Sequence, residues 1–266
     1  MSLTAEEQGI LRYFGRHLVA LCLTSRQGES PSRFTAYSGT LLRVDDAVLW
    51  LTAGHIIRQI EEALSSTEII IDETVLADAF GESFVSEKPV PIDLRSSPRF
   101  YRDDDNGMDF GAILLHPHHV RLLIANGVAI LEEANWIRQH NVTFEGYMML
   151  GLPEEFTSPE LPDDGLATVS PTMITVRRLE EEPEGHKLAS PRLTARIMDP
   201  IPLTSVVGMS GGPILGFAGN EKQLRYWIVA LQSAWLEQTR TTFACPLPVF
   251  APLLTEWVRS QTAEAA

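Results

Sequence analysis

Short stretches of alternating hydrophobic and polar residues run through most of this chain, and Gly, Pro, Ser and Asp residues separate them. Alternation over about four to eight residues is typical of β-strands, whereas an apolar residue at every third or fourth position indicates a helix. The strand-like stretches fall into two groups. The first group covers residues 17–24, 34–44, 47–53, 68–72, 89–94 and 109–116, and the second covers residues 142–153, 166–179, 192–198, 213–218, 226–235 and 241–247.

Helical periodicity is confined to a few places. Residues 4–15 follow this period after a threonine that can cap the first turn, and residues 250–261 form a second amphipathic pattern. Residues 55–64 change to a helical period directly after a strand, so His55 lies where a strand ends and a helix begins. Residues 117–127 hold one helical turn or two. Many short strands with helices only at the edges predict an all-β barrel or sandwich architecture, not alternating strands and helices.

The length of 266 residues allows either one large β unit or two smaller halves that share an interface, and the pattern favours two halves. Weak patterning over residues 125–141 marks the crossing between them. No apolar run approaches the ~18 residues of a membrane span. Residues 1–16 contain two glutamates and no apolar run of secretory length, so we expect no signal peptide, no membrane partner and a cytoplasmic location.

Charge and cysteine content narrow the function classes. A net charge of -14 argues against nucleic acid as a partner, because phosphate backbones are bound by clustered Lys and Arg. The two cysteines, Cys22 and Cys245, are too few for a disulfide-stapled secreted protein and lie in apolar stretches. We expect buried free thiols; the alternatives are one long-range disulfide or a catalytic thiol.

The segment from Gly208 to Pro213 reads Gly-Met-Ser-Gly-Gly-Pro and carries the most specific chemical signal of the chain. Glycines on both sides of Ser210 allow a tight turn that exposes the hydroxyl and lets a substrate carbonyl approach the backbone. The same turn can aim the amides of Gly208 and Ser210 at one point, where they would stabilise the oxyanion of a tetrahedral intermediate. The alternative is a plain Gly/Ser-rich turn between two strands.

A serine nucleophile needs a base, and that base needs a group that orients it. Of the seven histidines, His55 alone follows an apolar strand in a Thr-Ala-Gly-His stretch, where a small-residue turn can present its ring. Asp109 directly precedes the apolar run Phe-Gly-Ala-Ile-Leu-Leu, which places it at the mouth of a buried strand. The candidate catalytic residues are therefore His55, Asp109 and Ser210, in that order along the chain.

These motifs resemble those of the trypsin-like (chymotrypsin-fold) serine proteases. Residues 51–55 are similar to the family's histidine motif, residues 109–114 to its aspartate strand and residues 208–213 to its Gly-x-Ser-Gly-Gly-Pro turn. The resemblance covers about residues 17–261 and implies two six-stranded antiparallel barrels with the site in the cleft between them, followed by a C-terminal helix. With the N-terminal helix that the periodicity predicts, one peptidase domain divides into an N-terminal helix, a first barrel, a second barrel and a C-terminal helix, over residues 1–16, 17–131, 141–248 and 249–266.

The chain departs from the secreted animal members in two respects. Met209 stands where they have an aspartate that pairs with a newly cut N-terminus, so activation by that ion pair is not available here. No cysteines flank His55. We also expect no appended peptide-binding domain, so the chain resembles a minimal bacterial-type member.

The resemblance also suggests a substrate pocket. Thr204, six residues before the nucleophile, would lie at the floor of the pocket for the side chain that precedes the cut bond. Gln232, Ser233 and Ala234 would pair with the substrate backbone and line that pocket. A neutral floor and small neighbouring side chains predict a small to medium, uncharged side chain at this position of the substrate.

The predicted function is a serine endopeptidase that forms an acyl-enzyme on Ser210, with a polypeptide substrate and a protein regulator as partners. It needs no metal or organic cofactor; the cluster of His116, His118 and His119 has no Cys or carboxylate at ligand spacing and is expected to be a surface loop. The alternative is an inactive relative that serves as a peptide-binding or scaffold module. A serine esterase is disfavoured, because its fold alternates strands and helices and orders its site residues as Ser, acid, His.

Overall fold

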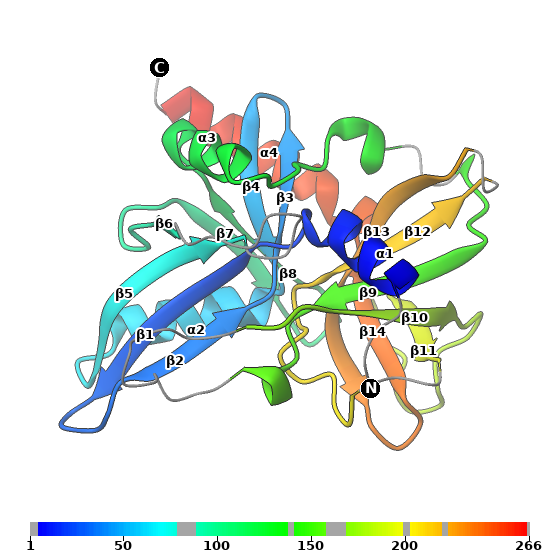
Figure 1. The fold of residues 1–266 in the computed structure, drawn as a ribbon, viewed down its shortest axis with the longest axis horizontal. Helices are drawn as coiled ribbons and strands as arrows, with labels where there is room; N and C mark the ends of the chain where they lie inside the picture. The colour runs from blue at the N-terminus through cyan, green and yellow to red at the C-terminus, as the bar shows by residue number, and fades with distance from the viewer. Residues whose placement is uncertain are drawn as a thin grey trace.

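The fold was analysed in a computed structural model of the chain (Figure 1). It describes residues 5–78, 89–137, 141–157, 169–198, 203–219 and 223–264. Parts of the sequence predictions lie outside the described residues: 1–4 and 265–266 at the ends of the chain, 138–140 in the crossing between halves, 166–168 at the start of a predicted strand, and 79–88, 158–165, 199–202 and 220–222 within the two predicted barrels.

The first half of the chain forms two antiparallel sheets of four strands each. One has the order β2-β1-β5-β6, and the other has the order β3-β4-β8-β7. The first sheet contains β1 (Ala20–Gln27), β2 (Arg33–Tyr37), β5 (Ile69–Ala77) and β6 (Val90–Pro91), and the second contains β3 (Thr40–Val44), β4 (Ala47–Thr52), β7 (Arg99–Asp103) and β8 (Asp109–Leu114). Within the described residues these sheets do not close, so this half differs from the six-stranded barrel expected there.

The division between the two sheets falls at Ser38 and Gly39, inside the single strand predicted over residues 34–44. The indole ring of Trp50 occupies the space where a side chain on Gly39 would lie, and its Nε1 donates to the carbonyl of Val19 at 2.9 Å. Ser38 makes its side-chain contacts with the second half of the chain. Because both residues leave the ladder, β2 and β3 pair in different sheets.

The second half is the closed barrel that the sequence predicts. Its six strands follow the order β10-β11-β14-β13-β12-β9 around the barrel, with antiparallel pairing throughout. They are β9 (Gly146–Gly151), β10 (Thr172–Arg178), β11 (Leu193–Ile197), β12 (Pro213–Ala218), β13 (Arg225–Leu236) and β14 (Thr241–Pro246). Figure 1 shows this barrel beside the two sheets of the first half.

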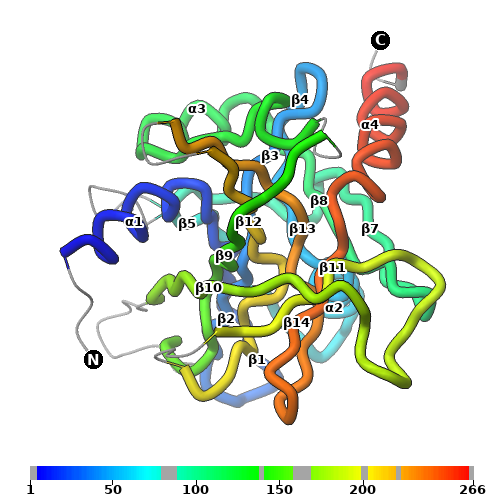
Figure 2. Tube along the Cα trace, turned by 90° about the vertical axis from the view of Figure 1, so that its right-hand side faces the viewer, coloured from blue at the N-terminus to red at the C-terminus, as the bar shows by residue number. Residues whose placement is uncertain are grey.

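Four α-helices and two short 3₁₀ helices, η1 (Glu133–Asn135) and η3 (Glu154–Phe156), surround the strands in the described part of the chain. The α-helices are α1 (Ala5–Gly15), α2 (Gly54–Ser65), α3 (Pro117–Ala125) and α4 (Leu247–Glu264). Figure 2 shows the predicted terminal helices, α1 and α4, on opposite sides of the strands. No α-helix of the described residues has the length and apolar character that a membrane crossing requires.

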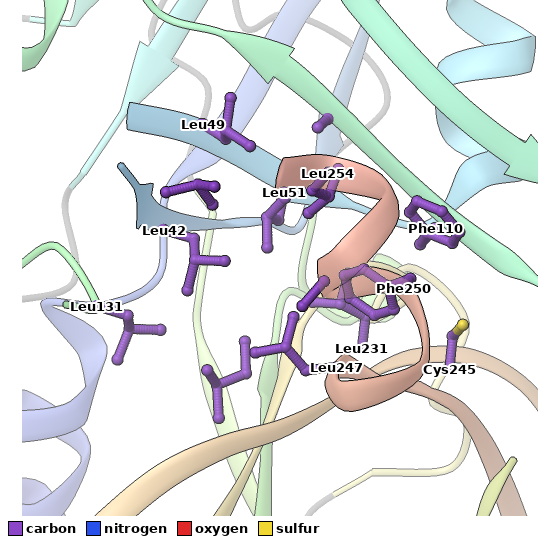
Figure 3. Packing of buried hydrophobic residues seen from close by; sticks show 14 of the residues in the cluster. Leu42, Leu49, Leu51, Phe110, Leu131, Leu231, Cys245, Leu247, Phe250 and Leu254 are labelled. Carbon is purple, nitrogen blue, oxygen red and sulfur yellow. The ribbon is translucent and has the colours of Figure 1, made fainter. Parts of the chain in front are cut away.

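A shared apolar core joins the two halves (Figure 3). Phe250 of α4 stacks on Phe110 of β8 with a distance of 4.5 Å between ring centroids. Leu51 of β4 and Leu231 of β13 belong to the same fully buried cluster, so both sheet systems contribute to it. Because Phe110 follows Asp109 directly, this core fixes the end of β8 that carries the candidate aspartate.

Both cysteines are buried and free, as the sequence predicts. Burial raises the pKa of Cys22 to about 12 and that of Cys245 to about 11, so neither thiol ionises near neutral pH. Both thiols are free in the structure, which therefore does not contain the long-range disulfide considered as an alternative.

Candidate active site

His55 lies in the first turn of α2, directly after the end of β4. Ala53 is extended and caps the helix, and Gly54 is its first residue. A Cβ atom on Gly54 would overlap the carbonyl of Arg102 and lie 2.9 Å from the carbonyl of Phe110. Glycine therefore lets the start of α2 approach β7 and β8 closely, and this approach brings His55 to Asp109.

Asp109, the first residue of β8, holds His55 with both carboxylate oxygens. Its Oδ1 accepts from the backbone amide of His55 at 2.9 Å, and its Oδ2 accepts from Nδ1 of the ring at 2.8 Å. Since a carboxylate only accepts, Nδ1 carries the proton, and Nε2 is left to act as an acceptor. The ring is thereby fixed in the tautomer that a general base requires.

The environment raises the pKa of His55 above its ordinary value. Burial acts in the opposite direction and is the largest single effect, because it disfavours the charged ring. The hydrogen bond and charge of Asp109, together with the charge of Asp103, outweigh burial and stabilise the imidazolium. An imidazole of this kind accepts a proton more readily than an isolated one.

The Ser210 turn lies against the strand end that precedes His55. Gly211 has φ +83°, and a Cβ atom there would overlap Oγ1 of Thr52 and come within 2.8 Å of the backbone nitrogen of Ala53. In this conformation the Ser210 hydroxyl donates to the carbonyl of Ser233 at 3.5 Å. The hydrogen bonds of the described residues do not include one between Ser210 and His55.

Two amides of the turn are free to bind a ligand. Glu154 N donates to Val207 O at 2.8 Å, and Gly212 N donates to Met209 O at 2.9 Å. The amides that follow these two carbonyls belong to Gly208 and Ser210, and neither donates to another group of the described chain. Two unpaired amides on one tight turn can hold an oxyanion.

Met209 anchors the turn from the inside. Its side chain is fully buried, and its Cβ would lie 3.0 Å from a Cβ atom on Gly151 of β9. Met209, which the sequence resemblance compared with an ion-paired aspartate, thus makes an apolar contact in this structure. The turn has this conformation without a charge partner for residue 209.

The predicted pocket residues fall in two places. Thr204 lines a small cavity of about 240 Å³, and both its amide and its hydroxyl donate to the carboxylate of Glu155. Ser233 and Ala234 lie on β13, where the carbonyl of Ser233 meets Ser210. Gln232 is buried, and its backbone pairs with Gly211 and Gly212, so it supports the turn and does not line the cavity.

Six residues of the cavity lining were not among the predicted site residues. Leu203, Ser205 and Val206 adjoin Thr204 in the chain, whereas Trp235, Glu237 and Arg240 belong to β13 and the turn that follows it. Trp235 follows Ala234 in the same strand, so extending the predicted pocket segment by one residue would have included it. Glu237 and Arg240 flank the turn between β13 and β14, and their spacing in the sequence carries no signal for a pocket.

The histidine cluster has a local role. Nδ1 of His116 accepts from the amide of His118 at 3.1 Å and so caps the start of α3. Within the described ranges, no group of three or more His, Cys, Asp or Glu side chains is arranged to hold a metal ion.

The fold is that of the chymotrypsin-like serine proteases. No family model and no curated protein sequence matches the chain. A Glu endopeptidase structure aligns over 98% of this chain and 96% of its own, with 14% identity and a TM-score of 0.52.

Two further serine protease structures align less closely. The thermostable protease AL20, from an extremophilic microorganism, covers 87% of this chain and 91% of its own, with 17% identity and a TM-score of 0.47. Protease Anisep from Arthrobacter nicotinovorans covers 88% and 94%, with 13% identity and a TM-score of 0.44. At 14% identity, the Glu endopeptidase comparison establishes the fold alone, and the roles of individual residues rest on the geometry above.

Proposed function

We propose that the chain is a serine endopeptidase that uses His55, Asp109 and Ser210. The two-point hold of Asp109 on His55 is the observation that carries this proposal, because it fixes both the tautomer and the position of the ring. A histidine with only a structural role at a strand end needs neither a fixed tautomer nor a fixed ring position. The unpaired amides of Gly208 and Ser210 beside it support an oxyanion site.

The proposed reaction forms and breaks one ester. Ser210 Oγ attacks the peptide carbonyl while Nε2 of His55 takes its proton, and the amides of Gly208 and Ser210 stabilise the oxyanion. His55 then gives the proton to the leaving amine, and water hydrolyses the ester in a second, similar step. Rotation of the Ser210 side chain from Ser233 O towards His55 precedes the attack.

The cavity lined by Thr204 and Trp235 is the proposed site for the substrate side chain before the cut bond. Its volume of about 240 Å³ suits a small to medium side chain. Glu237 and Arg240 contribute opposite charges to its lining, so neither sign of substrate charge is favoured overall. We also propose a cytoplasmic location, because two free buried thiols suit a reducing compartment.

A fluorophosphonate probe tests the activated serine directly. In this reaction Ser210 Oγ forms a bond to phosphorus and fluoride leaves. We expect labelling of the wild-type protein and none of Ser210→Ala or His55→Ala. Ser190→Ala is the matched control, because Ser190 is a half-buried serine of the same half of the chain whose hydroxyl has no role in the proposed site.

The alternative function is a binding module that retains the fold without catalysis. The direction of the Ser210 hydroxyl, towards Ser233 and not His55, favours this alternative. If the folded wild-type protein is not labelled, even after limited proteolysis or addition of cell extract, the binding module is supported and regulation does not explain the result. If Ser210→Ala is labelled as strongly as wild type, the proposed site is wrong.

A further inference from the structure

Ser38 connects the first half of the chain to the proposed oxyanion turn. It lies between β2 and β3 and is fully buried. Its hydroxyl donates to the carbonyl of Gly208 at 3.0 Å and accepts from the amide of Leu152 at 2.9 Å. Its own carbonyl accepts from Oγ1 of Thr52 at 2.8 Å, which ties it to the end of β4.

The turn contains three successive peptide units, whose carbonyls belong to Val207, Gly208 and Met209. Each of these carbonyls accepts a hydrogen bond. Backbone amides hold the carbonyls of Val207 and Met209, whereas the Ser38 side chain holds that of Gly208. In a trans peptide the C=O and the N–H point in opposite directions, so a held carbonyl also aims the amide that follows it. The peptide unit with the Gly208 carbonyl, called the Gly208 unit here, is the middle one. The units before and after it carry the amides of Gly208 and Ser210, which are the proposed oxyanion donors.

The middle peptide unit is held at both of its polar groups, since Ser38 donates to its carbonyl and its N–H, on Met209, donates to the carbonyl of Val206 at 3.1 Å. Gly208 has φ +90°, and glycine adopts such positive φ values about as readily as negative ones. A Cβ atom here would lie 2.6 Å from the nitrogen of Glu154, so no other residue fits. The conformation of Gly208 is therefore set by its hydrogen bonds and not by its own torsional preference.

We propose that Ser38 is a positioning residue that holds the Gly208 unit, and with it the amides of Gly208 and Ser210, in the geometry that binds the oxyanion. This inference rests on the proposed protease function and extends it to a residue outside the three-residue site. Ser38 contributes no atom to the reacting groups. It acts through the backbone of the turn.

Replacement of Ser38 by Ala tests the proposal. The hydroxyl is lost, so Gly208 O and Leu152 N both lose a partner. We expect the rate of fluorophosphonate labelling and the kcat for a peptide substrate to fall about tenfold to a hundredfold, with KM little changed. Affinity for a peptide aldehyde, whose adduct places an oxyanion in the site, should fall in parallel with kcat.

Thr40→Val is the matched control. Thr40 lies two residues further along the chain, is equally buried, and donates through Oγ1 to the carbonyl of His17, away from the turn. Its loss should lower stability by a similar amount and leave the labelling rate within about twofold of wild type. Ser38→Cys retains a weak donor and serves as a second variant in case Ser38→Ala does not fold. Its rate of fluorophosphonate labelling should lie between those of wild type and Ser38→Ala.

The outcomes separate this inference from the proposed function. Wild-type labelling together with full activity of folded Ser38→Ala and Ser38→Cys would overturn the role of Ser38 alone. An equal loss of activity in Thr40→Val would also overturn it, because the effect would then be one of general stability. An unreactive wild-type protein would overturn both the protease function and the inference that depends on it.

Discussion

Acidification from pH 7 to pH 4 is expected to destabilise the fold through His17, a histidine that the proposed reaction does not use. His17 is 2% exposed and lies between the two halves. Nδ1 faces the carbonyl of Ala129 at 2.9 Å and must donate to it, so Nε2 accepts from the hydroxyl of Tyr226 at 2.9 Å. Protonation of Nε2 would remove this acceptor and place a charge in the core.

The magnitude follows from the pKa. Burial, and to a smaller extent the charge of Arg16, lowers the pKa of His17 from 6.5 to about 4, although the bond to Ala129 acts in the opposite direction. The unfolded chain therefore takes up this proton at a higher pH than the folded chain. The neutral ring stabilises the fold fully above pH 6.5, and this contribution, about 3 kcal/mol, is lost as the pH falls towards 4.

Urea unfolding at several pH values between 7 and 4 measures the effect. His17→Gln keeps an amide that can donate to Ala129 and an oxygen that can accept from Tyr226, but it does not titrate. The variant should lose about 3 kcal/mol less than wild type over this range, since other groups contribute equally to both. His186→Gln, at an exposed position, should follow wild type. Equal pH dependence of wild type and His17→Gln would refute the reasoning.

Two further predictions concern the proposed reaction. Because the pKa of His55 is raised, kcat/KM should rise with pH through a midpoint above 6.5, and a midpoint below 6.5 would contradict the Asp109 contact as its cause. In a panel of peptides that differ only at the residue before the cut bond, small to medium uncharged side chains should be cleaved fastest, and Trp235→Ala should shift the preference to larger ones; a preference for Lys, Arg or Glu would refute the proposed pocket lining.

The candidate site residues could be proposed from the sequence because their motifs are made of neighbouring residues. The glycines around Ser210, the small residues before His55 and the apolar run after Asp109 each specify a local backbone shape. The six strands of the second half were likewise predicted, since each alternates clearly and is bounded by turn residues. Few cysteines in apolar stretches were enough to predict buried free thiols.

Contacts between distant residues were decided by the tertiary structure. The strand predicted over residues 34–44 divides at Ser38 and Gly39. Trp50 packs against Gly39, and the Ser38 hydroxyl donates to the carbonyl of Gly208 in the second half of the chain. The strand β7 was not predicted, since its charged residues hide the alternation that pairing with β8 imposes. Neither Ser38 nor Glu237 has a sequence pattern that marks its position, because Ser38 bonds to Gly208 and Leu152 of the other half, and Glu237 lines a cavity with Thr204, which is distant in the sequence. Sequence motifs thus predicted the candidate site residues, and packing between the halves determined the contacts that hold those residues in place.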